Sequence, residues 1–403
     1  MYDLLKGIRI VEGASFVAAP LGALHMQQMG AEVIRFDPIG GGPDFTRWPR
    51  ADNGASFYWE GLNKGKKSVA IDLRSEEGRE LAQALAASVG RLISNYPARG
   101  FLSHDELTKR RTDMLTVRVM GWADGGNALD YTVNAALGVP LMTGPIDLGP
   151  DEPVNHMLPA WDLAAGLYAA FALLAAERAR VADGQGREIR VALGDIAISS
   201  LAALGLLAEG EVLGTDRPRF GNDLYGAFGR NFRTADDRQL MITAISPRQW
   251  SGLLKALGIE SQVSAIEAET GVSFASDEGL RFVHRDRLNP IVADAIAVRT
   301  YADLARAFDE SGVTWAPYRK LSEAVRKDAR VAENPMLSAV SHLTGATYLT
   351  AGAAGTIPGA VRGSPLRAPR LGEHSEEVLA EVMGIGSGTI ADLIDRRIIG
   401  VSR

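Results

Sequence analysis

Residues 5–36 read LKGIRIVEGASFVAAPLGALHMQQMGAEVIRF, and this stretch decides the fold. A short β-rich run, Ile8–Val11, precedes a helical segment, Pro20–Met29, and a second strand, Glu32–Phe36. Proline suits a first helical turn, and Gly30 supplies a C-terminal stop. The stretch therefore predicts a strand–helix–strand unit of a parallel sheet.

The same alternation continues toward the middle of the chain. Further strands are expected at Ser68–Ile71, Leu92–Ser94, Leu115–Val119 and Glu188–Leu193. Helices are expected after Ser75, which can act as an N-cap, and at Asp162–Arg180 and Ile196–Ala208. The pattern predicts an α/β fold in which helices cover a parallel sheet.

A second unit is expected after a break in this pattern. Glycine, proline, arginine and asparagine cluster in Gly214–Arg230, and a new strand begins at Leu240. The unit that this strand opens is expected to end near Pro317. Gly345–Pro369 is predicted to be an extended linker, and two short helices are expected after Glu373.

Composition excludes several classes of function. The 403 residues are 46% apolar and 23% charged, with a net charge of −6, so nucleic acid is not expected as a partner. The absence of cysteine excludes disulfides, zinc–thiolate sites and thiol catalysis. The first residues lack a signal-peptide pattern, and the most apolar run, Leu163–Ala176, is shorter than a membrane span. We therefore expect a cytoplasmic protein.

The loop after the first strand, Glu12–Pro20, lacks the G-x-G-x-x-G spacing of a dinucleotide site. Its small residues and the following helix N-terminus could still place backbone amides near a phosphate. Tight packing of strand against helix explains the same residues equally well.

Basic residues recur near the expected C-terminal ends of the strands. They are Arg35, Arg47, Lys64, Lys66, Lys67, Arg74 and Arg99. A polyanionic ligand needs several such charges in one crevice. Solvated surface charge is the alternative for each of them.

Asp162 is the most informative single residue, because it opens a long helix after the sequence LPAW. A helix start keeps a carboxylate ionised, and an ionised carboxylate can attack a thioester to form a mixed anhydride. A simple helix cap is the alternative use of aspartate at this position. No histidine pair has metal-ligand spacing, and no serine elbow or Walker loop occurs.

Six motifs, in this order, together resemble the family III (CaiB/BaiF-type) coenzyme A transferases, a family that includes α-methylacyl-CoA racemases. The motifs are LKGIRIV (5–11), GAEVIR (30–35), NKGKKS with IDLR (63–74), SNY (94–96), DLAAG (162–166) and PRLGEH (369–374). The family keeps its catalytic aspartate at the position of Asp162.

The resemblance implies a fold of two interlocked subunits, each with a large Rossmann-like domain and a smaller α/β domain. Residues 1–210 would form the N-terminal part of the large domain, 211–325 the linker and small domain, and 326–403 a linker and C-terminal part that returns to the large domain. It also implies coenzyme A, as part of the substrate, as the only cofactor, and no metal. By position, the coenzyme A site would contain Val17, Ala18, Ile71, Arg74, Asn95, Tyr96 and Arg99.

A narrower resemblance concerns residues 36–42, 154–162 and 224–230, which are similar to the 2-methylfumaryl-CoA isomerases. This subgroup moves coenzyme A between the C1 and C4 carboxylates of one mesaconate, in the 3-hydroxypropionate route of carbon assimilation. The acyl group would then lie near Asp130, His156, Tyr225 and Gly226.

Three alternatives stay open. The first is an intermolecular transferase acting on an acyl-CoA and a separate dicarboxylic acid, with the same residues. The second is a racemase, which the resemblance disfavours because Leu129 stands where racemases place a histidine base. The third is a noncatalytic acyl-CoA-binding scaffold, against which Asp162 argues.

Overall fold

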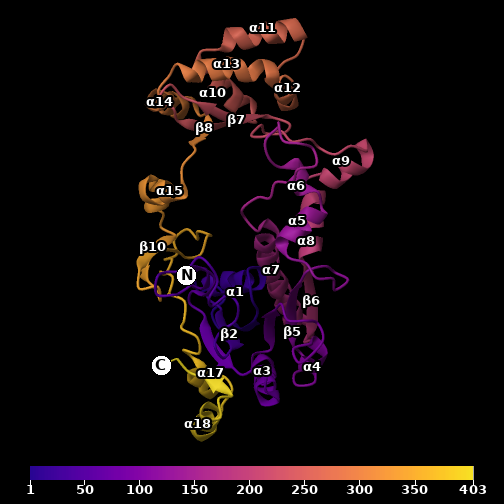
Figure 1. Ribbon diagram of the computed structural model, residues 1–403, viewed down its shortest axis with the longest axis vertical. Coiled ribbons are helices and arrows are strands. Elements are labelled where there is room, and N and C mark those ends of the chain that lie inside the picture. Colours follow the sequence, from indigo (N-terminus) through magenta and orange to yellow (C-terminus); the bar gives the residue numbers. More distant parts are fainter. Residues whose placement is uncertain (403) are drawn as a thin grey trace. The chain divides into compact units, whose positions relative to one another are not determined.

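The computed structural model describes residues 1–402, and the chain forms two compact units (Figure 1). Unit 1 contains residues 1–137, 157–214 and 332–402, so the chain leaves it and returns to it. Unit 2 contains residues 138–156 and 215–331.

Unit 1 is built on a seven-stranded sheet with the order β12-β3-β2-β1-β4-β5-β6. The strands are β1 (Arg9–Gly13), β2 (Glu32–Pro38), β3 (Lys67–Ile71), β4 (Arg91–Ser94), β5 (Leu115–Met120), β6 (Arg187–Ala192) and β12 (Ile399–Gly400). All neighbours are parallel except the antiparallel edge strand β12. The predicted parallel sheet is confirmed.

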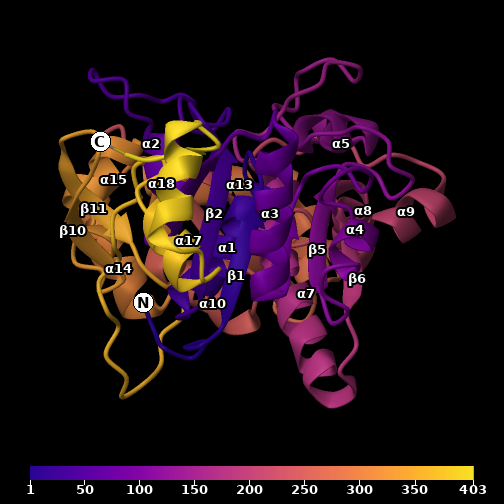
Figure 2. The same ribbon diagram turned by 90° about the horizontal axis from the view of Figure 1, so that it is seen from below.

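Helices cover both faces of this sheet. Those of unit 1 are α1 (Ala18–Gln28), α2 (Phe57–Asn63), α3 (Glu76–Val89), α4 (His104–Thr108), α5 (Asp130–Ala136), α7 (Ala160–Asp183), α8 (Leu193–Ala203), α9 (Leu206–Leu213), α17 (Ser375–Glu381) and α18 (Ser387–Asp395). α3, α17 and α18 share one apolar core with the strands, and Figure 2 shows them in front of the sheet. α1 and α7 pack against each other on the opposite face, as Figure 1 shows.

Two glycines set the close packing of α1 against α7. A Cβ at Gly22 would lie 2.9 Å from the Gly166 carbonyl oxygen, and a Cβ at Gly166 would lie 2.9 Å from the Ala18 carbonyl oxygen.

By length and composition α7 could also cross a membrane, as could the bent α8–α9 pair taken as one span. The sequence predicted that the apolar run Leu163–Ala176 is shorter than a membrane span. The helix that contains this run, α7, is longer and continues to Asp183.

Unit 2 has a small antiparallel sheet, β7-β8-β9, covered by helices. Its elements are β7 (Phe228–Arg233), β8 (Gln239–Ala244), β9 (Thr314–Pro317), α6 (Val139–Met142), α10 (Pro247–Leu257), α11 (Glu260–Thr270), α12 (Glu278–Val283), α13 (Arg285–Ala297), α14 (Tyr301–Ser311) and α15 (Leu321–Lys327), while α16 (Ala329–Ala332) lies at the junction with unit 1. Buried aromatic side chains such as Trp250, Phe274 and Phe308 fill its core.

Two details differ from the sequence-based expectation. Residues 138–156 belong to unit 2 rather than to the large domain, because the Arg219 guanidinium donates to the carbonyls of Thr143, Gly149 and Glu152. Gly345–Pro369 is not wholly extended linker, since β11 (Thr347–Ala351) pairs with β10 (Leu337–Ser341) as a hairpin. The two short helices expected after Glu373 are confirmed as α17 and α18.

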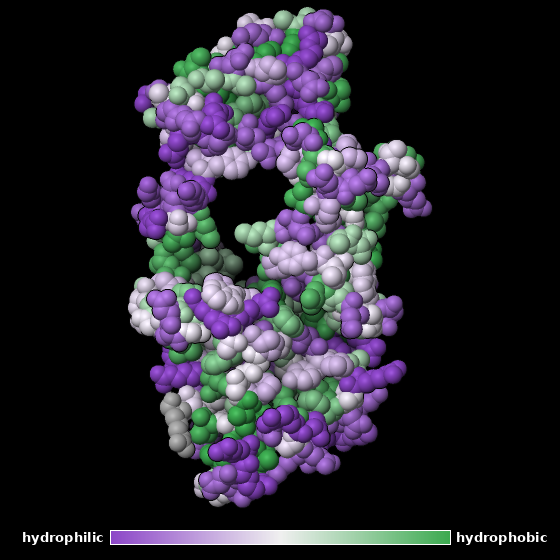
Figure 3. Space-filling model, viewed as in Figure 1, coloured by the Kyte–Doolittle hydropathy of each residue, from purple (hydrophilic) through white to green (hydrophobic). Residues whose placement is uncertain are grey.

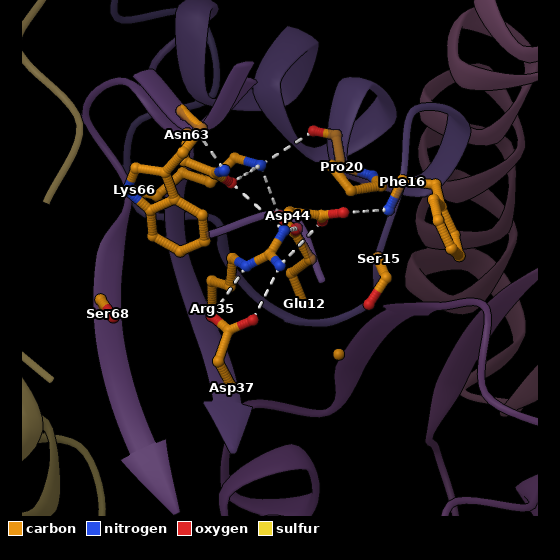
Figure 4. Close-up of polar contacts among 12 residues, drawn as sticks. Glu12, Ser15, Phe16, Pro20, Arg35, Asp37, Asp44, Asn63, Lys66 and Ser68 are labelled. Carbon is orange, nitrogen blue, oxygen red and sulfur yellow. Dashed lines mark hydrogen bonds and ion pairs between the residues drawn. The ribbon is translucent and has the colours of Figure 1, made fainter. Parts of the chain in front are cut away.

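A buried ion cluster joins β1, β2 and the loop after β2 (Figure 4). The guanidinium of Arg35 contacts Asp37 at 2.7 Å, Glu12 at 2.8 Å and Asp44 at 3.1 Å, and all four side chains are at most 2% exposed. Lys66 adds a second cation at 2.6 Å from Glu12. Burial alone would lower the pKa of Arg35, but the three carboxylates raise it above its ordinary value.

Removing the central cation should therefore destabilise the protein strongly. We expect Arg35→Met to lower the free energy of unfolding by roughly 3–5 kcal/mol, because three buried carboxylates lose their shared partner. Arg9→Met, which removes a half-exposed arginine from the neighbouring strand, should lower it by less than about 1 kcal/mol. Urea denaturation of both variants checks this, and similar small losses in the two would contradict it.

Candidate active site

The strand order of unit 1 fixes where a ligand can bind. The order β3-β2-β1-β4-β5-β6 changes direction between β1 and β4, so the loops after these two strands diverge. Ligands of open α/β sheets bind in the crevice at the carboxyl ends of strands at such a point.

A cavity of about 790 Å³ lies at this crevice, and all of its lining belongs to unit 1. The loops after β1, β4 and β5 contribute Ser15, Phe16, Val17, Ala18, Asn95, Tyr96, Pro97, Ala98, Gly121, Gly125, Asn127, Ala128 and Leu129. Further lining comes from Arg47, Tyr58, Arg118, Val119, Met120, Asp130, Tyr131, Thr132, Pro159, Asp162 and Leu193. We call it the switch-point cavity.

The loop after β1 is held in an unusual conformation. Phe16 has a φ of +68°, which is uncommon for a residue other than glycine. Its amide donates to Asp44 at 2.8 Å, and Ser15 exchanges hydrogen bonds with the side chain of Asn95 at 3.1 and 2.8 Å. The buried ion cluster therefore positions this loop through Asp44, as Figure 4 shows.

Asp162 lies in the first turn of α7 but does not cap it. Asp130 performs that role, because its Oδ2 accepts from the amides of Trp161 at 2.7 Å and Asp162 at 3.1 Å. The helix-cap alternative for Asp162 is therefore wrong, and its carboxylate is available to the cavity. Nothing in the local sequence could reveal this, because the cap comes from α5.

The surroundings of Asp162 make its carboxylate more basic. Burial is the larger cause and the charge of Asp130 the second, and together they raise the pKa of Asp162 to about 6. The positive charge of Arg47 acts in the opposite direction. The group is thus ionised at neutral pH yet more basic than an exposed aspartate.

The sequence-predicted site residues separate into three groups. Val17, Ala18, Asn95, Tyr96, Asp130 and Asp162 line the switch-point cavity. Ile71, Arg74 and Arg99 are not part of that lining: Ile71 is buried within β3, Arg74 is exposed and pairs with Asp72, and Arg99 is exposed. His156, Tyr225 and Gly226 belong to unit 2.

The basic residues that suggested a polyanion site are used differently. Arg35 and Lys66 are buried in the ion cluster, so solvated surface charge and ligand binding are both excluded for them. Among the seven basic residues predicted near strand ends, Arg47 alone lines the switch-point cavity as described by residues 1–402. Sequence reasoning missed Tyr58 and Arg118 there, because neither lies in a recognisable motif.

No group of three or more histidine, cysteine, aspartate or glutamate side chains suited to a metal ion occurs within residues 1–402. The cavity instead offers a basic carboxylate, backbone amides of a loop before a helix, and an arginine. This combination describes an α/β protein with a buried, basic carboxylate at the switch point of its sheet.

Comparison with known proteins gives the family. The model of CoA-transferase family III matches residues 5–375, and the chain therefore belongs to that family of CoA transferases. A 2-methylfumaryl-CoA isomerase from Chloroflexus aurantiacus is 44% identical, over 99% of this chain and 98% of its own. A succinyl-CoA:glutarate CoA-transferase from Mus musculus is 26% identical, over 97% and 89%.

The fold agrees with solved structures of the same kind. A CAIB/BAIF family protein from Brucella suis has a TM-score of 0.77 and 22% identity, covering 95% of this chain and all of its own. At that identity the likeness shows the fold alone. The family III fold expected for the single chain is confirmed, whereas the interlocking of two subunits stays a prediction.

Replacing Asp130 should change the acidity of Asp162. We expect Asp130→Asn to lower the pKa of Asp162 from about 6 toward the ordinary value of 3.8, because a neighbouring negative charge is lost. Asp124→Asn, in an exposed turn, should leave it unchanged. Titration of the aspartate carboxyl carbons by NMR checks this; an unchanged or higher value in Asp130→Asn would contradict it.

Proposed function

We propose that this protein is a 2-methylfumaryl-CoA isomerase, which moves coenzyme A from the C1 to the C4 carboxylate of one mesaconate. The observation that carries the proposal is the carboxylate of Asp162. It lies in the switch-point cavity, it does not act as the cap of α7, and its pKa is raised. The 44% identity to the Chloroflexus aurantiacus isomerase, over nearly all of both chains, supports this substrate.

The first half of the reaction opens the C1 thioester. The Asp162 carboxylate attacks the C1 carbonyl, and coenzyme A leaves as a thiolate, which forms an aspartyl–mesaconyl anhydride. The thiolate then attacks the aspartyl carbonyl of the anhydride. That step gives an aspartyl–CoA thioester and releases the C1 carboxylate of mesaconate.

The second half reverses these steps at the other end of the substrate. Mesaconate turns, and its C4 carboxylate attacks the aspartyl thioester, which releases the thiolate and forms a second anhydride. The thiolate attacks the C4 acyl carbonyl and restores the Asp162 carboxylate. The protein must exclude water from both anhydrides and hold thioester and carboxylate in line.

Coenzyme A would bind along the loops after β1 and β4. Val17, Ala18, Asn95 and Tyr96 line the cavity there, and the amides at the start of α1 can approach a phosphate. Ile71, Arg74 and Arg99 remain proposed contacts for the distal part of the cofactor. Asp130, His156, Tyr225 and Gly226 remain proposed neighbours of the acyl group.

An intermolecular transferase is the second candidate function. It is favoured by relatives such as the mouse succinyl-CoA:glutarate CoA-transferase, whose name specifies two different acids. A racemase is less favoured, since Leu129, on the cavity wall, cannot act as a base.

We also propose a cytoplasmic homodimer that serves the 3-hydroxypropionate route. Apolar side chains on α7 support a partner subunit: Leu167, Phe171 and Val181 are 59%, 62% and 75% exposed. In Figure 3, apolar residues, in green, are interspersed with polar ones on the visible face of unit 1. A second copy of the chain would cover these side chains of α7.

Asp162→Ala is expected to lower kcat by roughly 10⁴-fold or more, because no other group replaces the nucleophile. The variant should stay folded, with an unchanged circular-dichroism melting curve, since Asp130 supplies the cap. In the wild type, acyl-CoA and hydroxylamine should convert Asp162 to a hydroxamate found by peptide mass. Label confined to other acidic residues would contradict the assignment.

Transfer is expected to be intramolecular. Well-oriented groups reach effective molarities of about 10⁵ M or more, so the turned mesaconate should outcompete external acid at millimolar concentration. Unlabelled mesaconyl-C1-CoA with excess isotopically labelled mesaconate should therefore give C4-CoA almost free of label. Label entering in proportion to free acid would instead establish the intermolecular transferase.

A further inference from the structure

We propose that Arg47 is the specificity-determining residue of this site: it binds the substrate carboxylate that is not in the thioester. This inference rests on the proposed function. Arg47 would select a diacid over a simple acyl group and would keep the diacid in the switch-point cavity while the diacid turns.

Arg47 is held between two aromatic rings on the cavity wall. Its guanidinium lies 5.4 Å from the ring centre of Phe16 and 5.1 Å from that of Tyr58. Within residues 1–402 it forms no ion pair and its side chain donates no hydrogen bond to the protein. It lines the same cavity as Asp162, and its positive charge lowers the pKa of that carboxylate.

The other cation of the lining is already occupied. Arg118 contacts Glu188 at 2.7 Å and donates to the carbonyls of Tyr96, Pro97 and Leu102. Arg47 is therefore the cation that remains for an anionic ligand, among the described residues that line this cavity. A planar guanidinium is the side chain best matched to a carboxylate.

A second donor stands beside it. The hydroxyl of Tyr58 is buried and has no hydrogen-bond partner, and burial raises the pKa of this tyrosine, so the hydroxyl keeps its proton. Buried polar groups normally have partners, and Tyr58 also lines the cavity, so its hydroxyl is a candidate donor to a ligand. A carboxylate on Arg47 could accept from this hydroxyl as well.

The local structure fixes Arg47 before any ligand binds. Its amide donates to the Asp44 carbonyl at 3.3 Å, and its carbonyl accepts from Ser56 Oγ at 2.6 Å. Ser56 also caps α2, the helix that carries Tyr58, while Asp44 holds the amide of Phe16. Both rings and the cation between them are thus tied to the same two residues, which is the rigidity that a binding group needs.

The chemistry of transfer gives this cation its use. Asp162 reacts with one carboxyl carbon of the substrate, and the other carboxylate carries a full charge in a partly desolvated cavity. Such a charge needs a partner. Arg47 would hold the C4 carboxylate while C1 reacts, and the C1 carboxylate after the turn, so the diacid is never without its counter-ion.

The test uses two thioesters that differ in one group. In tiglyl-CoA a methyl group replaces the C4 carboxylate of mesaconyl-C1-CoA. The full-length wild type, Arg47→Gln and the control Arg50→Gln are incubated with each thioester and hydroxylamine, and the rate of hydroxamate formation on Asp162 is measured. Arg50 lies in the same loop, stacks on Trp48 and does not line the cavity.

With mesaconyl-C1-CoA, we expect Arg47→Gln to lower the rate of hydroxamate formation on Asp162 by at least about tenfold, the loss typical of a hydrogen bond to a charged group. The rate with tiglyl-CoA should fall by much less, because this thioester shares only the change in the pKa of Asp162. Arg50→Gln should match the wild type with both thioesters. Equal losses with the two thioesters, or no loss with either, would overturn the role of Arg47. A wild type that labels Asp162 with neither thioester would refute the proposed nucleophile instead.

Discussion

The ion cluster centred on Arg35 is the constraint on which the rest of the site depends. An isolated guanidinium in the core would be unstable, so Glu12, Asp37 and Asp44 must all approach it. Asp44 is brought from the loop after β2, and its second oxygen then accepts the amide of Phe16. One buried charge therefore joins two strands, and also shapes the loop at the mouth of the cavity.

The sequence predicted the parallel sheet well, because strands and helices of unit 1 alternate with clear periodicity and stop signals. The bounds of the helices were predicted less accurately. The expected helix Ile196–Ala208 is two helices, α8 and α9, because Gly205 adopts a φ of +77° between them. The membership of residues 138–156 in unit 2 depends on Arg219, about 70 residues away in the chain, and no local pattern contains that information.

The candidate site was predictable only in part, for a similar physical reason. Asp162 was proposed from its place at a helix start together with the family resemblance, but the cap of its helix, Asp130, comes from another helix. Charge type alone did not separate Arg35, which is buried and paired, from Arg47, which lines the cavity. Only the fold shows which cations already have partners.

The basicity of Asp162 suits the role proposed for it, in which it exchanges acyl groups with another carboxylate. A nucleophile whose pKa is about 6 is still mostly ionised at neutral pH, and it attacks a carbonyl more readily than an aspartate of ordinary acidity. In the proposed reaction the two ends of mesaconate are also carboxylates, so both anhydrides would join groups of the same class, and neither need be a deep energy minimum. Burial and Asp130 supply this basicity, while Arg47 limits it, so the residue proposed to bind the substrate also keeps the nucleophile charged.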